Sequence, residues 1–581
     1  MLAIGGLIDY AVTSDGAALS GDFQLTEMTI VYACNRVPVA TLTFLDGDPA
    51  TGTFALSNGD KLVPGKELEI KLGYDTRRET VFKGVVVKHT RRVAAVGGSY
   101  TEVTCKDKCV KMTLGREMAC FPGMKDSDVA AQLIGKHGLA ADVEDFGVTH
   151  PELLQYGCSD WDFVLLRADL HGKLVVAREG KLTIAAPDLG KAAVLTLEYG
   201  ANVLEFIAEL DAATQLAAVT AQAWDLGGQV MAESNARAVT LAEAGNLKGS
   251  DLSKVVGPDA YALRHAGSLK TEELGDWATA RLQKSRLARL RGEVTCAGTV
   301  LYPGDVIELK GLGDRFNGNV LVSGVRHELM NGNWTSHVTF GLDDDWYATQ
   351  VAVNSPPAGG LMPAVAGLQV GKVKKIDEDP DSLFRIQVNL PAFGTNALVW
   401  ARPAAPGAGS KRGFFCLPEV DDEVLVGFLD DDPRYPVVLG GLFSTNAAAP
   451  VAATASNDQK GFYSREGVQL TFDDKNKVLT LQTPGKNKVK LDDAGKTVTV
   501  EDGHGNKITL SQNGIVLDSA GDITLKATKN IKLTTASGNV DLSAVNITHA
   551  ANAKFAASGN AGVEVKSSAI ASLQGALVKI N

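Results

Sequence analysis

The chain has 581 residues and a formal net charge of −11; 45% of its residues are hydrophobic, 6% are aromatic and 61 are glycine. This length predicts several domains, roughly four at ~150 residues each, and the composition excludes a disordered chain. The sequence has no long basic run, which argues against a nucleic-acid partner, and no apolar stretch of ~18 residues, which argues against a membrane span.

The seven cysteines are scattered and odd in number, as expected for a protein made in a reducing compartment. Residues 1–9 lack the basic region of a signal peptide. We therefore expect synthesis and assembly in the bacterial cytoplasm, and any export to bypass the general secretory route. Cys105 and Cys109 have no second Cys/His pair nearby, so we expect no zinc site, and we also expect no cofactor.

Residues 1–355 form the first predicted region, which is mainly β with some helices. Up to about residue 120, apolar runs alternate with Gly and Pro and indicate strands. Helices are predicted at about 126–138, from Ser159 onward, and over 271–291. The last of these has acidic residues in its first turn and arginines in its last, an order that suits the helix dipole. Strands resume near residue 300 and continue to 341.

A Pro/Gly-rich linker is predicted at 356–367 and a compact all-β unit at 368–443. The five strands expected in this unit lie near 369–376, 384–389, 398–401, 423–428 and 437–442. Five short strands in about 75 residues are typical of an OB-fold barrel. An Ala-rich joint at 444–460 leads into a repeat at 461–581.

The repeat is a pair of Ile, Val or Leu residues, two positions apart, that returns every seven to ten residues, as in Ile508/Leu510 and Ile523/Leu525. Each such pair is called a beat below. Residues two apart on a strand point to the same face, so each pair marks a short strand with one apolar side. The spacing is near ten before residue 506 and near eight after it. We therefore expect wide layers that lead into a narrower shaft.

Eight residues of extended chain cover at most about 26–28 Å, which is too short for one chain to enclose a core. Two arrangements remain: an antiparallel meander within one chain, or three identical chains wound into an intertwined triple-stranded β-helix. A meander of more than ten strands exceeds the usual size of an open sheet and leaves its apolar face uncovered. The sequence therefore favours a homotrimer with a needle-shaped C-terminal region.

In such a trimer, one set of side chains converges on the common axis. The predicted axis residues are Ile523, Leu525, Ile531, Leu533, Val540, Leu542, Ile547 and His549. Three His549 rings would meet around water or, as the alternative, around a metal or an anion. The final layer is uncapped, and an end of this kind is adhesive. The residues predicted to bind a further protein there are Leu577, Val578, Lys579, Ile580 and Asn581.

The segment Gly413-Phe-Phe-Cys-Leu-Pro-Glu-Val-Asp-Asp-Glu-Val-Leu-Val-Gly-Phe428 resembles the OB-domain signature of VgrG-type spike proteins of contractile injection systems. Val399-Trp-Ala-Arg402, Ser159-Asp-Trp-Asp-Phe163 and Asn319-Val-Leu-Val-Ser-Gly-Val-Arg-His327 are also similar to this family. The resemblance covers nearly the whole chain. It leaves open whether the machine is a type VI secretion system, an extracellular phage-tail-like particle or a phage tail.

The resemblance implies a structural spike that joins a tail tube to a membrane-puncturing needle. The implied hub has two barrel-like domains per chain, forms a pseudo-sixfold ring and docks on a hexameric, Hcp-like tube protein. The implied needle carries a PAAR-type tip protein. The other implied partners are baseplate proteins, an effector cargo and, after ejection by sheath contraction, the envelope of a target cell.

No enzyme activity is expected. The joint at 444–460 is too short for the lysozyme domain that some phage relatives insert there, and a glycosidase needs two carboxylates across a cleft. Asp430-Asp431-Asp432 is expected to be a solvated turn instead. The alternatives are a trimeric phage tail fibre or tailspike-like adhesin, or a polysaccharide-binding protein. These would require a terminal receptor-binding domain, or longer coils with a carboxylate-lined groove.

Overall fold

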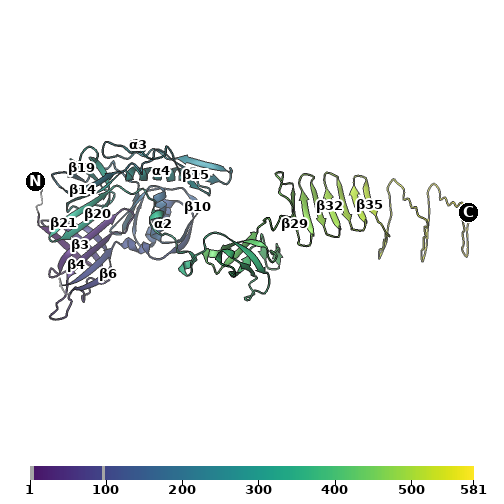
Figure 1. Ribbon diagram of the computed structural model, residues 1–581, viewed down its shortest axis with the longest axis horizontal. Helices are drawn as coiled ribbons and strands as arrows, with labels where there is room; N and C mark the ends of the chain where they lie inside the picture. Colours follow the sequence, from purple (N-terminus) through teal and green to yellow (C-terminus); the bar gives the residue numbers. More distant parts are fainter. Residues whose placement is uncertain (1–5, 95–97, 581) are drawn as a thin grey trace. The chain divides into compact units, whose positions relative to one another are not determined.

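The computed structural model describes residues 6–94 and 98–580, which form two compact units, 1–440 and 441–581 (Figure 1). Residues 1–5, part of the stretch on which the signal-peptide prediction rests, and Asn581 of the predicted tip lie outside the described residues. None of the helices in the described ranges combines the length and the apolarity needed to cross a membrane.

The first unit is built on a 13-stranded sheet with the order β14-β18-β21-β20-β3-β4-β7-β6-β5-β1-β2, to which β19 and β13 are joined through β20. Its N-terminal strands are β1 (Ile8–Ser14), β2 (Ala17–Ala18), β3 (Gln24–Ala33), β4 (Val39–Leu45), β5 (Glu67–Tyr74), β6 (Arg77–Ala94) and β7 (Gly98–Lys106). Its later strands are β13 (Leu195–Glu198), β14 (Val203–Leu210), β18 (Leu290–Ala297), β19 (Val306–Lys310), β20 (Gly318–Met330) and β21 (Asn333–Phe340).

The sheet is continuous because β3 pairs antiparallel with β20, which places Tyr32 opposite Val325. Inward and outward side chains alternate strictly along β4, as in a sheet with one buried face. The side chains of β1–β7 enclose one core around Ile30 and Phe82, and those of β18–β21 enclose a second around Val294 and Phe340. These strands therefore carry two cores on one shared sheet, and the two barrel-like domains implied by the resemblance stay a prediction.

The three predicted helices are present as α1 (Asp126–Lys136), α2 (Asp160–Leu170) and α4 (Thr271–Ala288). Helix α2 begins next to Ser159 as predicted, and Ser159 caps it, with its Oγ accepting a hydrogen bond from the Asp162 N–H at 3.1 Å. Asp126 lies in the first turn of α1, and its carboxylate contacts a cluster of histidine and arginine side chains. Two short helices were not predicted, α3 (Gly249–Leu252) and α5 (Tyr347–Gln350), and a 3₁₀ turn η1 (Lys108–Thr113) follows β7.

Three small sheets complete the part of the chain that precedes the linker at 356–367, which is called the hub below. They pair β8 (Glu117–Met124) with β10 (His150–Cys158); β12 (Lys181–Ala185) with β9 (Ala140–Val143) and β11 (Leu174–Arg178); and β15 (Val219–Asp225) with β16 (Val230–Asn235) and β17 (Tyr261–His265). Helix α4 packs on β15 and β16, where Leu274, Ala278 and Ala221 are buried together.

Residues 369–441 form a closed five-stranded barrel with the order β22-β23-β24-β28-β27. Its strands are β22 (Gln369–Lys375), β23 (Ile386–Asn389), β24 (Leu398–Pro403), β27 (Glu423–Phe428) and β28 (Pro436–Gly441). The predicted OB-fold is confirmed, with strand ends that differ by at most two residues. A small hairpin, β25 (Ala408–Gly409) and β26 (Arg412–Gly413), lies outside the barrel.

The second unit begins with a seven-stranded antiparallel meander within one chain. Its strands are β29 (Gln459–Tyr463), β30 (Gln469–Asp473), β31 (Val478–Gln482), β32 (Lys488–Asp492), β33 (Thr497–Glu501), β34 (Lys507–Ser511) and β35 (Gly514–Asp518). From 519 to 580 the described chain forms no strand with itself (Figure 1). A meander within one chain was not expected for the whole repeat. It is present over the first half of the repeat only. Seven short strands remain within the usual size of a sheet, whereas the shorter beats beyond Asp518 leave no paired strand.

His327 on β20 is a buried group that makes the hub sensitive to acid. Its Nδ1 lies 2.9 Å from Ser336 Oγ, and burial lowers the pKa of the imidazole to about 4. A histidine with a lowered folded-state pKa contributes stability above its unfolded pKa, near 6.5, and that contribution is lost as the pH falls towards the folded value.

We therefore expect the hub to lose about 3 kcal/mol of unfolding free energy between pH 7 and pH 4 through His327, at 1.36 kcal/mol per pKa unit. His327→Gln should remove this part of the pH dependence, measured by calorimetry of the full chain across that range. His265→Gln, at an exposed histidine of β17, is the control and should keep the wild-type slope. An unchanged slope in His327→Gln would contradict the assignment.

Candidate functional site

The meander has one apolar face, made of two columns of side chains that run across the strands. The strand registers place in the first column Phe462, Leu470, Leu481, Val489, Val500, Ile508 and Leu517. The second column holds Phe472, Leu479, Leu491, Val498, Leu510 and Ile515. Because residues two apart share a face, the paired residues of every beat lie side by side in these columns.

The opposite face is polar and its register is fixed by charge. Its central row is Thr471, Thr480, Lys490, Thr499, Thr509 and Val516. Along one edge, Lys488 pairs with Glu501, which lies opposite Lys507, which in turn lies opposite Asp518. The hydrogen bond from Lys488 holds the pKa of Glu501 below its ordinary value. Alternating charges across neighbouring strands favour this register over a slipped one.

The apolar face is left uncovered by the chain's own residues. Thr499 of the polar row is only 9% exposed, whereas Ile515 and Leu517 of the apolar columns are 70% and 52% exposed. A hollow of about 590 Å³ lies over this face and is lined by side chains that include Leu481, Val500 and Ile508. A sheet whose apolar face is more open than its polar face lacks its packing partner.

The predicted axis residues are in the same condition. Ile523, Leu525, Ile531, Leu533, Val540, Leu542, Ile547 and His549 are all exposed, with Leu533 at 65%. His549 stacks on Phe555 of the same chain, with ring centroids 5.7 Å apart. At the predicted tip, Leu577, Val578 and Ile580 are exposed, as is Lys579. One chain thus presents these residues but does not bring them together.

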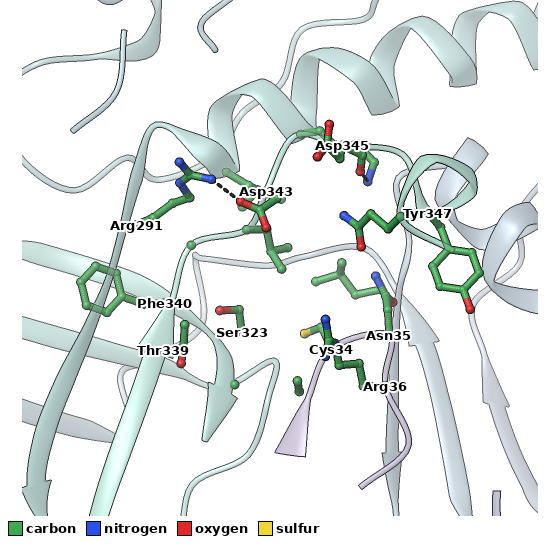
Figure 2. Close-up of a pocket in the computed structure, with 18 of the residues that line it drawn as sticks. Cys34, Asn35, Arg36, Arg291, Ser323, Thr339, Phe340, Asp343, Asp345 and Tyr347 are labelled. Atoms are coloured by element: carbon green, nitrogen blue, oxygen red, sulfur yellow. Dashed lines mark hydrogen bonds and ion pairs between the residues drawn. The ribbon is translucent and has the colours of Figure 1, made fainter. Parts of the chain in front are cut away.

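The hub contains a cavity of about 970 Å³, which Figure 2 shows in close-up. Cys34, Asn35 and Arg36 line it from the β3–β4 connection, while Arg291 and Asp343 form an ion pair on another side. Burial raises the pKa of the Cys34 thiol to about 12, so this cysteine is not a thiolate at neutral pH. The lining therefore gains no activated nucleophile from Cys34.

A buried ionic cluster joins α1, α2 and α4 of the hub. The Asp126 carboxylate accepts hydrogen bonds from Arg167 and lies 3.0 Å from the Nε2 atoms of both His150 and His171. His171 Nδ1 lies 2.7 Å from Asp276 Oδ2. An imidazole that donates to two carboxylates must carry both protons, so the geometry requires a charged His171.

The pKa values of this cluster follow from the same contacts. Burial alone would raise the pKa of Asp126 and lower that of His171, but their mutual hydrogen bond reverses both shifts. The pKa of Asp126 therefore lies below its ordinary value and that of His171 lies above it. This cluster was not predicted, because its members are up to 150 residues apart and form no sequence motif. The acidic first turn of α1 was its only local signal.

The remaining residues considered for metal binding or catalysis are Cys105, Cys109 and the turn from Asp430 to Asp432. Cys105 and Cys109 are both buried, and within the described ranges no group of three or more His, Cys, Asp or Glu side chains is placed to hold a metal ion. The prediction of a solvated turn holds for Asp430, which is exposed with a left-handed backbone. It is wrong for Asp432, which is buried because its carboxylate is paired with Arg434 at 2.6 Å.

Comparison with known families gives matches along most of the chain. Residues 5–331 match the Alg8 N-terminal domain, residues 369–443 match the type VI secretion system/phage-baseplate injector OB domain, and residues 477–547 match the phage baseplate V C-terminal trimerisation domain. The chain is 25% identical over 384 residues to the type VI secretion spike protein VgrG4b of Pseudomonas aeruginosa, a match that covers 59% of this chain and 46% of that protein. It is 32% identical over 77 residues to the spike protein VgrG3 of Vibrio cholerae, covering 12% and 8% of the two chains. The chain thus spans less than half the length of these relatives.

Among solved structures, a tail protein of Neisseria meningitidis aligns with 58% of this chain and 98% of its own, at a TM-score of 0.43 and 13% identity. A chain of the Francisella PdpA-VgrG complex aligns with 89% of this chain and 88% of its own, at a TM-score of 0.39 and 8% identity.

Proposed function

Because the chain belongs to the Alg8 N-terminal domain family over residues 5–331 and is a VgrG-type spike protein, we propose that it is the homotrimeric central spike of a contractile injection machine. In this role the 13-stranded hub docks on a ring of tail-tube protein and contacts the baseplate. The C-terminal unit forms the needle that punctures a target envelope. The protein acts mechanically rather than as an enzyme. It is assembled in the cytoplasm and ejected with its cargo when a sheath contracts.

The observation that carries this proposal is the continuous uncovered apolar face from the meander to the last described beat. Burying a half-exposed apolar side chain contributes on the order of 1 kcal/mol, and the apolar columns and axis residues together supply sixteen such side chains per chain. Three copies placed about one axis would cover all three faces at once, without a long open edge. The match of residues 477–547 to a trimerisation domain supports the same number.

The test is the mass of the purified full chain by light scattering and native mass spectrometry. We expect three chains of 61.1 kDa in one particle, resistant to dilution. A stable single chain at micromolar concentration would refute the proposal.

We also propose that the last described beat binds a tip protein. Leu577, Val578 and Ile580 expose apolar side chains next to Lys579, and exposed apolar groups of this kind are suited to a protein partner. Val578→Asp combined with Ile580→Asp should abolish co-purification of the tip protein while the particle mass stays that of a trimer. Lys554→Ala, at an exposed residue outside the predicted tip, should retain the tip protein. Retention by the double variant would contradict this placement.

A further inference from the structure

The OB barrel holds a strained loop just before β23. Glu378, Ser382 and Phe384 have left-handed backbone angles, with φ of 58°, 55° and 61°. None of them is glycine, and each such residue costs about 1–3 kcal/mol, which persists only where the surroundings enforce it. Strain of this kind concentrates at functional sites.

The surroundings that enforce the loop centre on Asp379. Its carboxylate accepts hydrogen bonds from the backbone N–H groups of Asp381, Leu383 and Arg385, at 2.8–3.2 Å. It also accepts two bonds from the Arg385 guanidinium, at 3.1 and 2.6 Å. The bonds from Arg385 hold the pKa of Asp379 well below its ordinary value, so the carboxylate remains charged at any physiological pH. Five donors on one carboxylate make the loop rigid.

The rigid loop presents apolar side chains to solvent. Phe384 is 63% exposed, Leu383 is 61% exposed, and Phe415 of a neighbouring segment is 79% exposed. The rings of Phe384 and Phe415 lie 6.3 Å apart, and Phe415 follows the β25–β26 hairpin. These three side chains are called the OB aromatic patch below. Aromatic groups that are preorganised and exposed are the usual anchors of protein interfaces.

We infer that the OB aromatic patch packs against the OB barrel of a second copy of this chain within the spike. The inference rests on the proposed trimer. The barrel's last strand ends at Gly441 and the needle sheet begins at Gln459, so the joint spans roughly 17 residues, or at most about 60 Å. Three barrels tethered this closely to one axis face each other at about millimolar effective concentration, well above that of a free partner.

A native thiol reports on the patch. Cys416 is adjacent to Phe415 and is exposed in the single chain, and Cys120 is the other exposed thiol, while Cys34, Cys105, Cys109, Cys158 and Cys296 are buried. In a Cys120→Ser background, a maleimide therefore reads the accessibility of Cys416. We expect labelling of the trimer to be about tenfold slower, or more, than labelling of the chain dissociated by Leu525→Asp, Leu533→Asp and Leu542→Asp, which corresponds to a covered state favoured about ten to one.

Phe384→Ser should bring the labelling rate of the trimer close to that of the dissociated chain without changing the particle mass. Phe393→Ser, at another exposed aromatic residue of the barrel but outside the patch, should leave the slow rate unchanged. Equal rates in the wild-type trimer and the dissociated chain would overturn the inference and assign the patch to an outside partner. Absence of a trimer in the same sample would instead overturn the proposed function, so the two failures are distinguishable.

Discussion

A variant that carries Leu525→Asp, Leu533→Asp and Leu542→Asp together in every chain is expected to convert the trimeric spike into single chains. All three are predicted axis residues, and 60–65% of each side chain is exposed in the isolated chain. In the trimer the changes remove nine buried leucines, a loss on the order of 10 kcal/mol. They also place nine carboxylates on one axis, where burial and mutual repulsion oppose their charged forms. The expected readout is a fall in particle mass from three chains to one.

The matched control places the same added charge on the other side of the same beats. Thr524, Thr534 and Ser543 adjoin the three leucines in sequence. In the strands proposed for the trimer they are expected to point the opposite way, because side chains alternate along an extended strand. Thr524→Asp, Thr534→Asp and Ser543→Asp should leave the trimer intact. If both triple variants remain trimeric, the leucines do not face the axis. If both dissociate, charge rather than position is responsible.

The parts of the fold that could be predicted are those whose sequence signals lie within a few neighbouring residues. The OB strands and the helices α1, α2 and α4 carry their signals within a dozen residues, and their positions follow from the sequence. The apolar columns of the needle were also predictable, because a two-residue spacing fixes the face whatever the pairing. The choice between a meander and intertwined chains was not, since the same two-residue spacing is compatible with either pairing.

Long-range contacts explain the misses. The pairing of β3 with β20 joins residues nearly 300 positions apart, and nothing in either strand specifies the other. Asp126 and Asp379 were missed for a different reason. Each looks like an ordinary acidic residue of a helix end or a turn, and only the folded chain shows that it collects several donors. Their importance comes from burial and geometry rather than from residue type.

Asp126→Ala is expected to be the most destabilising single substitution in the hub. It leaves the guanidinium of Arg167 and the imidazolium of His171 without their shared partner, and the His171 side chain is only 1% exposed. Removing one partner of a buried ion pair typically costs about 3–5 kcal/mol. Asp128→Ala is the matched control, because Asp128 is exposed in the same first turn of α1 and offers only a helix-dipole contribution of about 0.3–1 kcal/mol. Calorimetry of the full chain should show the hub transition lowered strongly by the first change and barely by the second.

The same variant should alter the pH dependence in two directions. The raised pKa of His171 means that its contribution is complete below its unfolded pKa, near 6.5, and is lost as the pH rises through the folded value. The lowered pKa of Asp126 means that its contribution is present above its unfolded pKa, near 3.8, and is lost as the pH falls through the folded value. The wild-type hub should therefore gain stability from this cluster between these limits, and Asp126→Ala should flatten both flanks of the profile. A variant that lost stability equally at every pH would indicate that packing alone, and not the charge of the cluster, holds α1, α2 and α4 together.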